Sequence, residues 1–591
     1  MTAGTSIAAP TEISCNVLLV CPRFHGRSFW DNSAACEVFG AGIPAPPLGL
    51  ITVAAMLPAS WECRLVNRST EELSEADLDW ADMVMTGGMI PQRPDTQAVI
   101  ELAQARGKPV VVGGPDATSS PEAYEQADFR VLGEAEGIID AFIAAWDAGS
   151  RQGIFTAEKF TIDVTKTPIP RYDLLKRSHY VYYGVQFSRG CPFTCEFCDI
   201  IELYGRVPRF KTTEQILAEL ETVYRLGYRG HVDFVDDNFI GNKKAVKNLL
   251  SHLIAWQQAH GFPFQFSTEA SINLADDDQL LALMRAANFY IVFVGIESPD
   301  PATLISAQKK QNTRRVLADS VQKIYRAGMM VNAGFIVGFD SEKDGVAEAM
   351  IELIEAAAIP VCMVGLLFAL PNTQLSRRLE KEGRLLPASY VVDLVAEVGG
   401  GDQCAIGLNF LTARPRCDIL NDLKRILQGA YDPAAYYQRV RTVARLLDRP
   451  VLDKRRSTEL AQRTLGVSLR ELALVCRIVS LVARRHREVL RHFLRALFEA
   501  AWKNPRALGF VFTLTLIYCH LGPFARHVVS VLDQRLALPP DEHGVENLPT
   551  RPRSRPWSRS SGADDLFRPS GGLRCQLQGL GLWLSHAANA R

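Results

Sequence analysis

Short apolar runs alternate with helix-length segments between residues 16 and 145. The runs are rich in Val, Leu and Ile and end at Gly, Pro or polar residues, as buried strands of a parallel sheet do. The segments between them, such as 47–58 and 94–107, are long enough for helices. This alternation predicts a doubly wound, Rossmann-like α/β domain whose ligand lies beyond the carboxyl ends of the strands. The expected strands are 16–20, 62–66, 82–86, 109–114 and 128–134.

A second strand–helix series follows a proline-containing connector, 146–182, and extends over 183–412. One of its helices has defined ends, because Thr212 and Gln215 form a capping box and Gly227 follows the last turn. Six strand–helix units predict a partial, open (β/α)6 barrel with its chemistry at the carboxyl ends of the strands. The expected strands are 183–188, 231–236, 264–268, 290–296, 331–338 and 361–370.

From residue 413 to 540 the pattern is helical, and 413–440 is expected to pack against the barrel or to help close its mouth. A basic amphipathic helix follows, and then an apolar stretch, 507–519, that is expected to end by Pro523. Such a pair of segments, 468–520, can lie in a membrane interface. A helical hairpin packed on the protein is the alternative. The arginines of the basic helix are Arg484, Arg485, Arg487, Arg491 and Arg495.

Composition narrows the choice of partners and compartment. The chain has 591 residues, enough for two or three domains, and its 65 basic residues balance 65 acidic ones, so nothing points to nucleic acid. Residues 1–15 lack an export signal and are expected to be flexible, and 541–591, rich in Arg, Ser and Pro, is expected to be disordered. Thirteen irregularly spaced cysteines indicate reduced thiols in the cytoplasm. No stretch reaches the roughly 20 apolar residues that span a bilayer.

Three cysteines are concentrated in "CPFTCEFC", directly after the first expected strand of the barrel. A structural zinc site takes four ligands, and neither His179 nor His231 supplies a paired ligand nearby. A disulfide would leave one thiol over and requires an oxidising compartment. A four-iron cluster held by three thiolates leaves one iron open to a ligand that is not protein. The candidate ligands are Cys191, Cys195 and Cys198.

The C-x3-C-x2-C spacing, with Phe197 before the third cysteine, resembles the signature of the radical S-adenosylmethionine (SAM) enzymes. In that family the amino and carboxylate groups of SAM chelate the open iron. The blocks "FVDDNFIGNKK", "TEASINLADDDQL", "VGIESP", "GFIVGFD" and "LPNTQL" extend the resemblance over residues 16–445. They resemble a group of bacterial cobalamin-binding radical SAM proteins that includes the hopanoid C-2 methylase. A degenerate or zinc-filled loop is the alternative.

The resemblance implies a SAM site at successive strand ends. One of two adjacent acids would hold the amino group of SAM, a serine and a glutamate would bind the ribose, and another glutamate would lie at the barrel mouth. A G-x-I-x-G strand would run along the adenine, followed by an acid one position earlier than usual. Taken singly, each acid is better interpreted as a helix cap or a loop ion pair, but their occurrence together at successive strand ends beside the three cysteines favours the functional interpretation. Asp236 and Asp237 are the two adjacent acids, Ser267 and Glu269 are the ribose pair, and Glu297 is the glutamate at the barrel mouth. Gly338 belongs to the G-x-I-x-G strand, and Asp340 is the acid that follows it.

The first domain looks like a cobalamin-binding domain. Its first strand leads into "CPRFHG" rather than a dinucleotide fingerprint, while Thr86 and the pair Gly113 and Gly114 stand where that fold has its Ser/Thr-Gly loop and paired glycines. An ordinary tight turn is the alternative for the glycines. Because the D-x-H-x-x-G pattern is absent, we expect cobalamin without a protein imidazole ligand and interpret His25 as a loop residue.

Taken together, the resemblance implies a cobalamin-dependent radical SAM C-methyltransferase that acts on an unactivated carbon of a hydrophobic, polycyclic lipid-like substrate. It would receive electrons from a donor such as flavodoxin or ferredoxin. A radical SAM cyclase or rearrangement enzyme with cobalamin, and a non-catalytic cobalamin or cluster sensor, are the alternatives. Tyr204, Arg206 and Arg209 are expected to border the gap between the two domains or to lie in a solvated loop. We expect a cytoplasmic protein with peripheral membrane contact through 468–520.

Overall fold

The computed structural model describes residues 14–24, 27–387, 407–448 and 469–537. The expectations for His25, for the tail at 541–591 and for residues 1–13 of the N-terminus therefore lie outside the described residues.

The N-terminal sheet has six parallel strands in the order β2-β1-β3-β4-β5-β6. Side chains of β1 alternate between two cores, with Val17 and Leu19 in one and Leu18 and Val20 in the other, so helices cover both faces of the sheet. The strands are β1 (Cys15–Cys21), β2 (Trp61–Asn67), β3 (Met83–Gly87), β4 (Val110–Gly113), β5 (Phe129–Leu132) and β6 (Gly153–Thr156), and the helices are α1 (Ser33–Phe39), α2 (Leu48–Ala54), α3 (Glu75–Trp80), α4 (Arg93–Gln104), α5 (Gly114–Ser119) and α6 (Ile139–Asp147).

The second sheet also has six parallel strands, in the order β14-β13-β12-β11-β10-β7, and its two end strands do not pair with each other. The predicted α/β fold class is confirmed, including the open barrel. The strands are β7 (Tyr183–Val185), β10 (Gly230–Phe234), β11 (Phe264–Glu269), β12 (Phe289–Glu297), β13 (Met330–Val337) and β14 (Val361–Leu366). The helices are α7 (Ile200–Leu203), α8 (Thr213–Arg225), α9 (Lys243–Ala259), α10 (Asp278–Ala286), α11 (Pro301–Ser306), α12 (Leu317–Arg326), α13 (Val346–Ala357) and α14 (Gln374–Lys381), and a small antiparallel pair, β8 (Ser188–Arg189) and β9 (Arg209–Phe210), lies beside the barrel.

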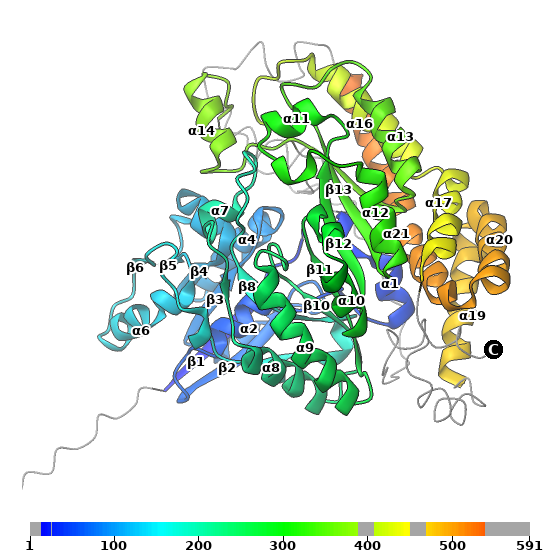
Figure 1. The fold of residues 1–591 in the computed structure, drawn as a ribbon. Helices are drawn as coiled ribbons and strands as arrows, with labels where there is room; N and C mark the ends of the chain where they lie inside the picture. Colours follow the sequence, from blue (N-terminus) through cyan, green and yellow to red (C-terminus); the bar gives the residue numbers. More distant parts are fainter. Residues whose placement is uncertain (1–13, 25–26, 388–406, 449–468, 538–591) are drawn as a thin grey trace, which may run out of the picture.

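The C-terminal helices lie beside the barrel, on the side away from the N-terminal sheet (Figure 1). The predicted packing of 413–440 is confirmed, because the Tyr431 hydroxyl donates to the Cys362 carbonyl of β14 at 2.6 Å. These helices are α16 (Arg416–Ala430), α17 (Pro433–Leu446), α19 (Leu469–Arg485), α20 (Arg487–Lys503) and α21 (Leu508–Leu536).

The helix that carries the apolar stretch 507–519 is longer than that stretch, because α21 continues through Pro523 to Leu536. A proline inside a helix removes one hydrogen bond and crowds the preceding turn. Buried side chains lie on both sides of it, among them Tyr518 and Val528, and their packing outweighs that cost.

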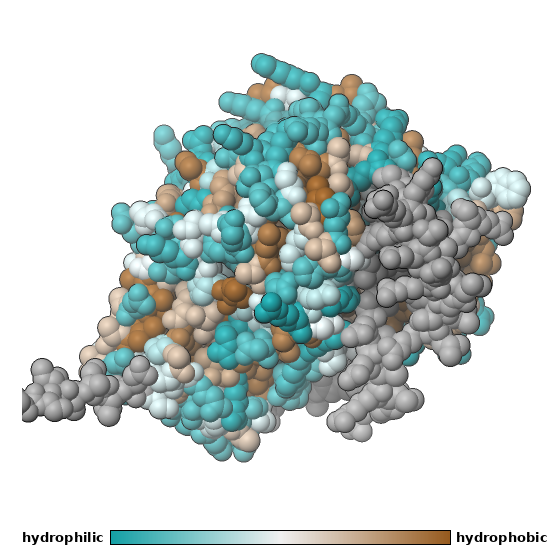
Figure 2. Space-filling view, turned by 60° about the horizontal axis from the view of Figure 1, so that its bottom comes forward, coloured by the Kyte–Doolittle hydropathy of each residue, from teal (hydrophilic) through white to brown (hydrophobic). Residues whose placement is uncertain are grey.

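Residues 505–536 are long and apolar enough to cross a membrane by length and composition, but 78% of the most apolar window is buried inside the protein. The core helix of a soluble protein has the same properties, so this helix is weak support for a membrane span. On the face shown in Figure 2, hydrophilic residues predominate and hydrophobic residues lie in small separate groups.

A buried ion-pair network joins the carboxyl edges of the two sheets. Arg189 of β8 contacts Glu134 at 3.1 Å and Glu136 at 2.7 Å, and Arg209 of β9 contacts Glu134 at 2.8 Å. Both glutamates follow β5. Arg209 therefore borders the junction between the domains, whereas Arg206 is exposed to solvent.

We expect Glu134→Ala to weaken this junction by about 3 kcal/mol, because two buried guanidinium groups lose a carboxylate. Trypsin cleavage within 146–182 should then be at least tenfold faster than in the parent protein, as judged by the band pattern over time. Glu158→Ala, at an exposed position of the same connector, is the matched control. Equal cleavage rates for the two variants would contradict this role of the ion pairs.

Candidate functional site

The three cysteines lie on one loop between β8 and α7, at the carboxyl end of the barrel. The loop is held at both ends. Gly190 has φ +95°, and its amide donates to the Asp237 carboxylate at 2.8 Å. The Cys191 amide donates to the Gly205 carbonyl at 3.2 Å, and the Glu196 amide donates to Ala307 at 3.0 Å. These hydrogen bonds fix the ends of the eight-residue stretch that carries Cys191, Cys195 and Cys198.

Amide side chains point at two of the sulfur atoms. Nδ2 of Asn238 lies 3.7 Å from Sγ of Cys191, and Nε2 of Gln311 lies 3.5 Å from Sγ of Cys195. Burial raises the pKa of Cys191 and of Cys198 above that of an ordinary thiol. In the described part of the chain, no three His, Cys, Asp or Glu side chains surround a position for a single metal ion. The donor set, three thiols with amide donors, fits a sulfur-containing cluster.

A lysine–glutamate pair lies beside the cysteine loop. Lys309 Nζ donates to Glu297 Oε1 at 2.7 Å and lies 5.9 Å from the centre of the Phe197 ring. Burial alone would lower the pKa of Lys309, but the adjacent Glu297 carboxylate raises it. Glu297 has φ +66°, and a Cβ at Gly295 would lie 2.3 Å from Glu297 Oε1. The glycine therefore makes room for the pair.

Sequence reasoning located Glu297 and Phe197 but missed three neighbours of the cysteines. Asn238 directly follows the two predicted acids, which is a positional signal that could have identified it. Lys309 and Gln311 lie in "AQKKQN", a polar segment whose pattern is typical of a solvated loop. Only the fold brings them to the sulfur atoms.

The two acids after β10 hold the backbone that leads to the cysteines. Asp236 is buried and accepts hydrogen bonds from the amides of Phe187 at 3.1 Å and Ser188 at 2.5 Å, and from the Ser188 hydroxyl. Burial raises the pKa of Asp236 to about 7 and that of Asp237 to about 6. Asp237 is the less buried of the two, so it is the acid that retains access to a ligand.

Ser267 and Glu269 face a cavity inside the barrel. The Ser267 hydroxyl donates to Asp233, and its oxygen lies 2.6 Å from Nε2 of His231. Because that hydroxyl proton is used, His231 is the donor in the second contact. Burial lowers the pKa of His231 to about 3, so the imidazole is neutral. Burial, with Asp233 and Asp237 nearby, raises the pKa of Glu269 to about 8.

The residues after β13 make contacts within the protein. Gly338 has φ +113°, and its amide donates to Glu342 at 2.9 Å. Asp340 is paired with Arg378 at 3.0 Å and with Arg384 at 2.5 Å, and these arginines lower the pKa that burial alone would raise. This contact matches the ion-pair alternative for Asp340.

In the N-terminal sheet, Thr86 and the two glycines make backbone contacts. The Thr86 hydroxyl donates to the Val20 carbonyl of β1 at 2.9 Å. A Cβ at Gly113 would lie 3.0 Å from the Val131 carbonyl oxygen, and Gly114 has φ +90°. Close approach of β5 accounts for Gly113 and the left-handed backbone accounts for Gly114, as the tight-turn alternative expects.

Three family models match consecutive parts of the chain. They are the B12 binding domain over residues 40–143, the radical SAM superfamily over 185–354 and a domain of unknown function (DUF4070) over 373–534. The first two coincide with the two parallel sheets, and the third covers the C-terminal helices.

Similar sequences include two bacterial methyltransferases. An uncharacterised methyltransferase of Synechocystis sp. is 48% identical over 424 residues, which are 71% of this chain and 77% of that protein. The hopanoid C-2 methylase of Rhodopseudomonas palustris is 39% identical over 387 residues, 64% of this chain and 72% of that protein.

Similar folds include two cobalamin-dependent radical SAM enzymes. OxsB with aqua-cobalamin bound has a TM-score of 0.54 at 15% identity, covering 88% of this chain and 83% of that chain. The methyltransferase TsrM of Kitasatospora setae, with cobalamin and a [4Fe-4S] cluster bound, has a TM-score of 0.52 at 16% identity, covering 63% and 78%. At these identities the likeness supports the fold alone.

We expect Glu269→Gln to change the pH dependence of stability. The folded-state pKa of Glu269, about 8, exceeds the ordinary value of 4.5, so its stabilising proton is fully held below about pH 4.5 and lost as the pH rises through about 8. The parent protein should therefore lose more stability than the variant between pH 5.5 and 8.5, measured as the urea midpoint of the full chain. Parallel pH profiles would show that the surroundings of this carboxyl do not raise its pKa.

Proposed function

Because the chain belongs to the cobalamin-binding radical SAM family, we propose that it is a methyltransferase that modifies an unactivated carbon of a hydrophobic substrate. The family uses a [4Fe-4S] cluster, SAM and cobalamin. The observation that carries the proposal is the position of the three-cysteine loop. It lies at the carboxyl end of the barrel, and the ion pairs of Arg189 tie that end to the carboxyl edge of the N-terminal sheet.

In this proposal Cys191, Cys195 and Cys198 hold the cluster. When bound, the cluster and SAM supply the radical chemistry that activates the carbon, and cobalamin supplies the methyl group. The chain provides the polar groups around the cysteine sulfur atoms. The amide groups of Asn238 and Gln311 donate to sulfur, which stabilises negative charge at the site and tunes its reduction potential.

For SAM, we assign Asp237 to the ammonium group and Asp236 to positioning the loop. A carboxylate and an ammonium form a strong charge-assisted hydrogen bond, and Asp237 is the acid with remaining access. Phe197, Glu297 and Lys309 would border the same ligand beside the cysteines. Ser267, Glu269, Gly338 and Asp340 stay predictions as SAM contacts.

For cobalamin, we assign the carboxyl edge of the N-terminal sheet, where Thr86, Gly113 and Gly114 lie. Their hydrogen bonds and close contacts fix the ends of β3 and β4 against the neighbouring strands, which would shape the surface under the cofactor. The hopanoid C-2 methylase relative supports a polycyclic lipid-like substrate. A reductant of the flavodoxin or ferredoxin class would supply electrons.

We further propose peripheral membrane contact, with the protein in the cytoplasm and α20 at the surface of the bilayer. Leu494, Phe498 and Trp502 are 50%, 74% and 80% exposed and follow one another at four-residue intervals. An exposed row of arginines runs beside them at three-residue offsets, so one helix face is apolar and the adjacent face is basic. These arginines are Arg487, Arg491 and Arg495.

The proposed enzyme is tested by anaerobic reconstitution with iron, sulfide, dithionite and SAM. We expect 5′-deoxyadenosine to form in the parent protein. Cys191→Ala should lose the cluster absorption and at least 99% of that product, because one ligand of the cluster is removed. Cys417→Ala, at an exposed cysteine on α16, is the control and should retain both. No 5′-deoxyadenosine from a protein with an intact cluster would overturn the enzymatic proposal.

The membrane proposal is tested by liposome flotation. Replacing Leu494, Phe498 and Trp502 with Ser should abolish flotation of the full chain with anionic vesicles, because each fully buried large side chain contributes about 1.5–3 kcal/mol. High salt should release the parent protein, since the arginines contribute about 1 kcal/mol each near an anionic surface.

The matched control replaces Ile154, Ile305 and Val316, which are 57%, 58% and 62% exposed, with Ser. That variant should float like the parent protein. If both triple variants float equally, α20 serves only in the packing of the protein and the membrane proposal is wrong.

A further inference from the structure

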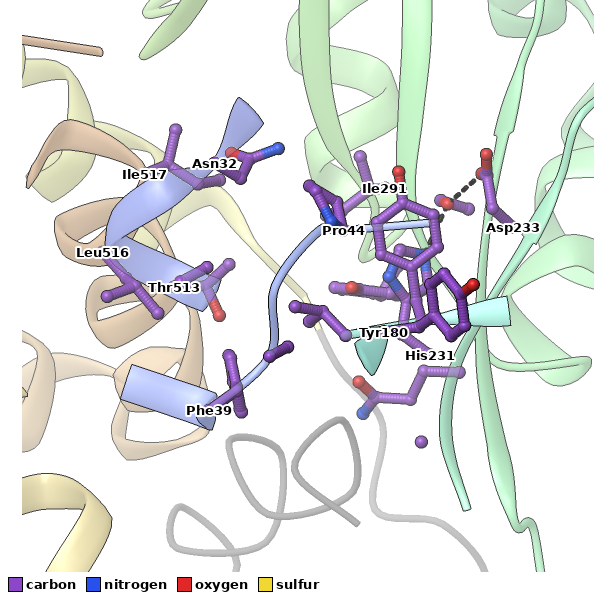
Figure 3. Close-up of a pocket in the computed structure, with 18 of the residues that line it drawn as sticks. Asn32, Phe39, Pro44, Tyr180, His231, Asp233, Ile291, Thr513, Leu516 and Ile517 are labelled. Atoms are coloured by element: carbon purple, nitrogen blue, oxygen red, sulfur yellow. Dashed lines mark hydrogen bonds between the residues drawn. The ribbon is translucent and has the colours of Figure 1, made fainter. Parts of the chain in front are cut away.

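A cavity of about 800 Å³ lies between the inner face of the barrel, α21 and the segment that contains α1 (Figure 3). Figure 3 shows Leu516 and Ile517 of α21 on one side and His231 and Asp233 of β10 on the other. Cavities that enclose a small organic ligand have volumes of roughly 300–1,000 Å³, so this one is large enough for a multi-ring molecule.

The barrel side of the cavity carries polar residues on three strands, beside the apolar Ile291 and Phe293 of β12. In a parallel barrel the inward positions are normally filled by bulky apolar side chains that pack the core. Here successive inward positions carry His231 and Asp233 on β10, Gln265 and Ser267 on β11, and Asn332 on β13. The polar positions leave space in place of a packed core, which favours a ligand inside the barrel.

Two polar residues of the lining, Asn332 and Glu269, lie at the same level of the barrel. Oδ1 of Asn332 is buried without a hydrogen-bond partner. Glu269 faces the cavity, and the pairing register puts it level with Asn332, through Phe293 of β12. A buried polar group without a partner is costly, so a ligand that donates to Asn332 would be favoured.

The opposite wall is apolar and belongs to the domain of unknown function. Phe510, Leu516 and Ile517 of α21 line it, with Phe39 of α1 beside them. His520 fixes the two helices together, because its Nε2 donates to the Ser28 carbonyl at 2.9 Å and its Nδ1 accepts from the Ser33 hydroxyl at 3.0 Å. The helix α21 thus covers the side that the open barrel leaves unpaired.

We infer that this cavity is the substrate chamber, that α21 is its apolar wall, and that the substrate is an apolar ring system carrying one hydrogen-bonding group. The ring system lies against α21, and the polar group lies among Asn332, Glu269 and Ser267. Glu269 lies between the chamber and the cysteine site, because its side chain lines the cavity and its carbonyl accepts a hydrogen bond at 2.9 Å from the amide of Phe239, the residue after Asn238. The inference rests on the proposed function and specifies its substrate class.

The test compares two probes, a pentacyclic triterpene alcohol and the hydrocarbon with the same ring skeleton. Each is titrated into the full chain, and quenching of Trp30, which lines the cavity, reports binding. The Trp30→Phe variant should lose this quenching, which shows that the signal comes from Trp30. We expect the alcohol to bind about tenfold more tightly, a ratio that corresponds to roughly 1.4 kcal/mol for one added hydrogen bond.

Variants test the contributions of the polar wall and the apolar wall to binding separately. Asn332→Leu should reduce the alcohol-to-hydrocarbon preference to about onefold while the hydrocarbon binds as before. Thr513→Phe, which adds a ring inside the cavity, should weaken both probes at least tenfold, and Ser530→Phe, on the exposed side of α21, should weaken neither. Ser530→Phe also controls for correct folding.

The outcomes distinguish this inference from the proposed function. A protein that forms 5′-deoxyadenosine but binds neither probe would overturn the chamber and leave the radical SAM proposal standing. Equal binding of both probes, unchanged in Asn332→Leu, would overturn the polar subsite. Binding with the expected preference, but no 5′-deoxyadenosine, would support the chamber and overturn the enzymatic proposal.

Discussion

The ion pairs between Arg189, Arg209, Glu134 and Glu136 hold the carboxyl edges of two parallel sheets against each other. In each sheet, that edge is where ligands bind. The same short β8–β9 ribbon that carries the arginines leads directly into the cysteine loop. This charge network therefore helps to fix the cysteine loop against the N-terminal sheet, and chemistry that uses both edges depends on that placement.

The arrangement of the N-terminal sheet follows from the sequence because its central strands β1, β3 and β4 are continuous apolar runs with defined ends. The strand β6 was missed, since its Ile154 is 57% exposed and half of its side chains face solvent. Pro523 lies inside α21, although proline disfavours a helix interior by local propensity, because tertiary packing overrides that propensity. The local sequence pattern therefore predicts an element correctly only where tertiary packing does not oppose the local preference.

Only part of the candidate site could be predicted from the sequence, for a similar reason. The cysteines are adjacent in sequence, so their spacing reveals them. Asp340 occupies a typical position for a ligand, but its partners, Arg378 and Arg384, come from a later segment that no local pattern connects to it. The folding of the segment after α11 brings Gln311 to the sulfur of Cys195 and Lys309 to Glu297 beside the cysteine loop.

The close contact at Gly295 restricts the substitutions that this part of the chain can accept. An alanine at this position would displace Glu297, whose left-handed backbone is already unfavourable for a residue with a side chain. Displacing Glu297 would in turn leave the buried Lys309 without its carboxylate. Substitutions at these three positions are therefore not independent, and a homologue that replaces one of them should replace the others as well.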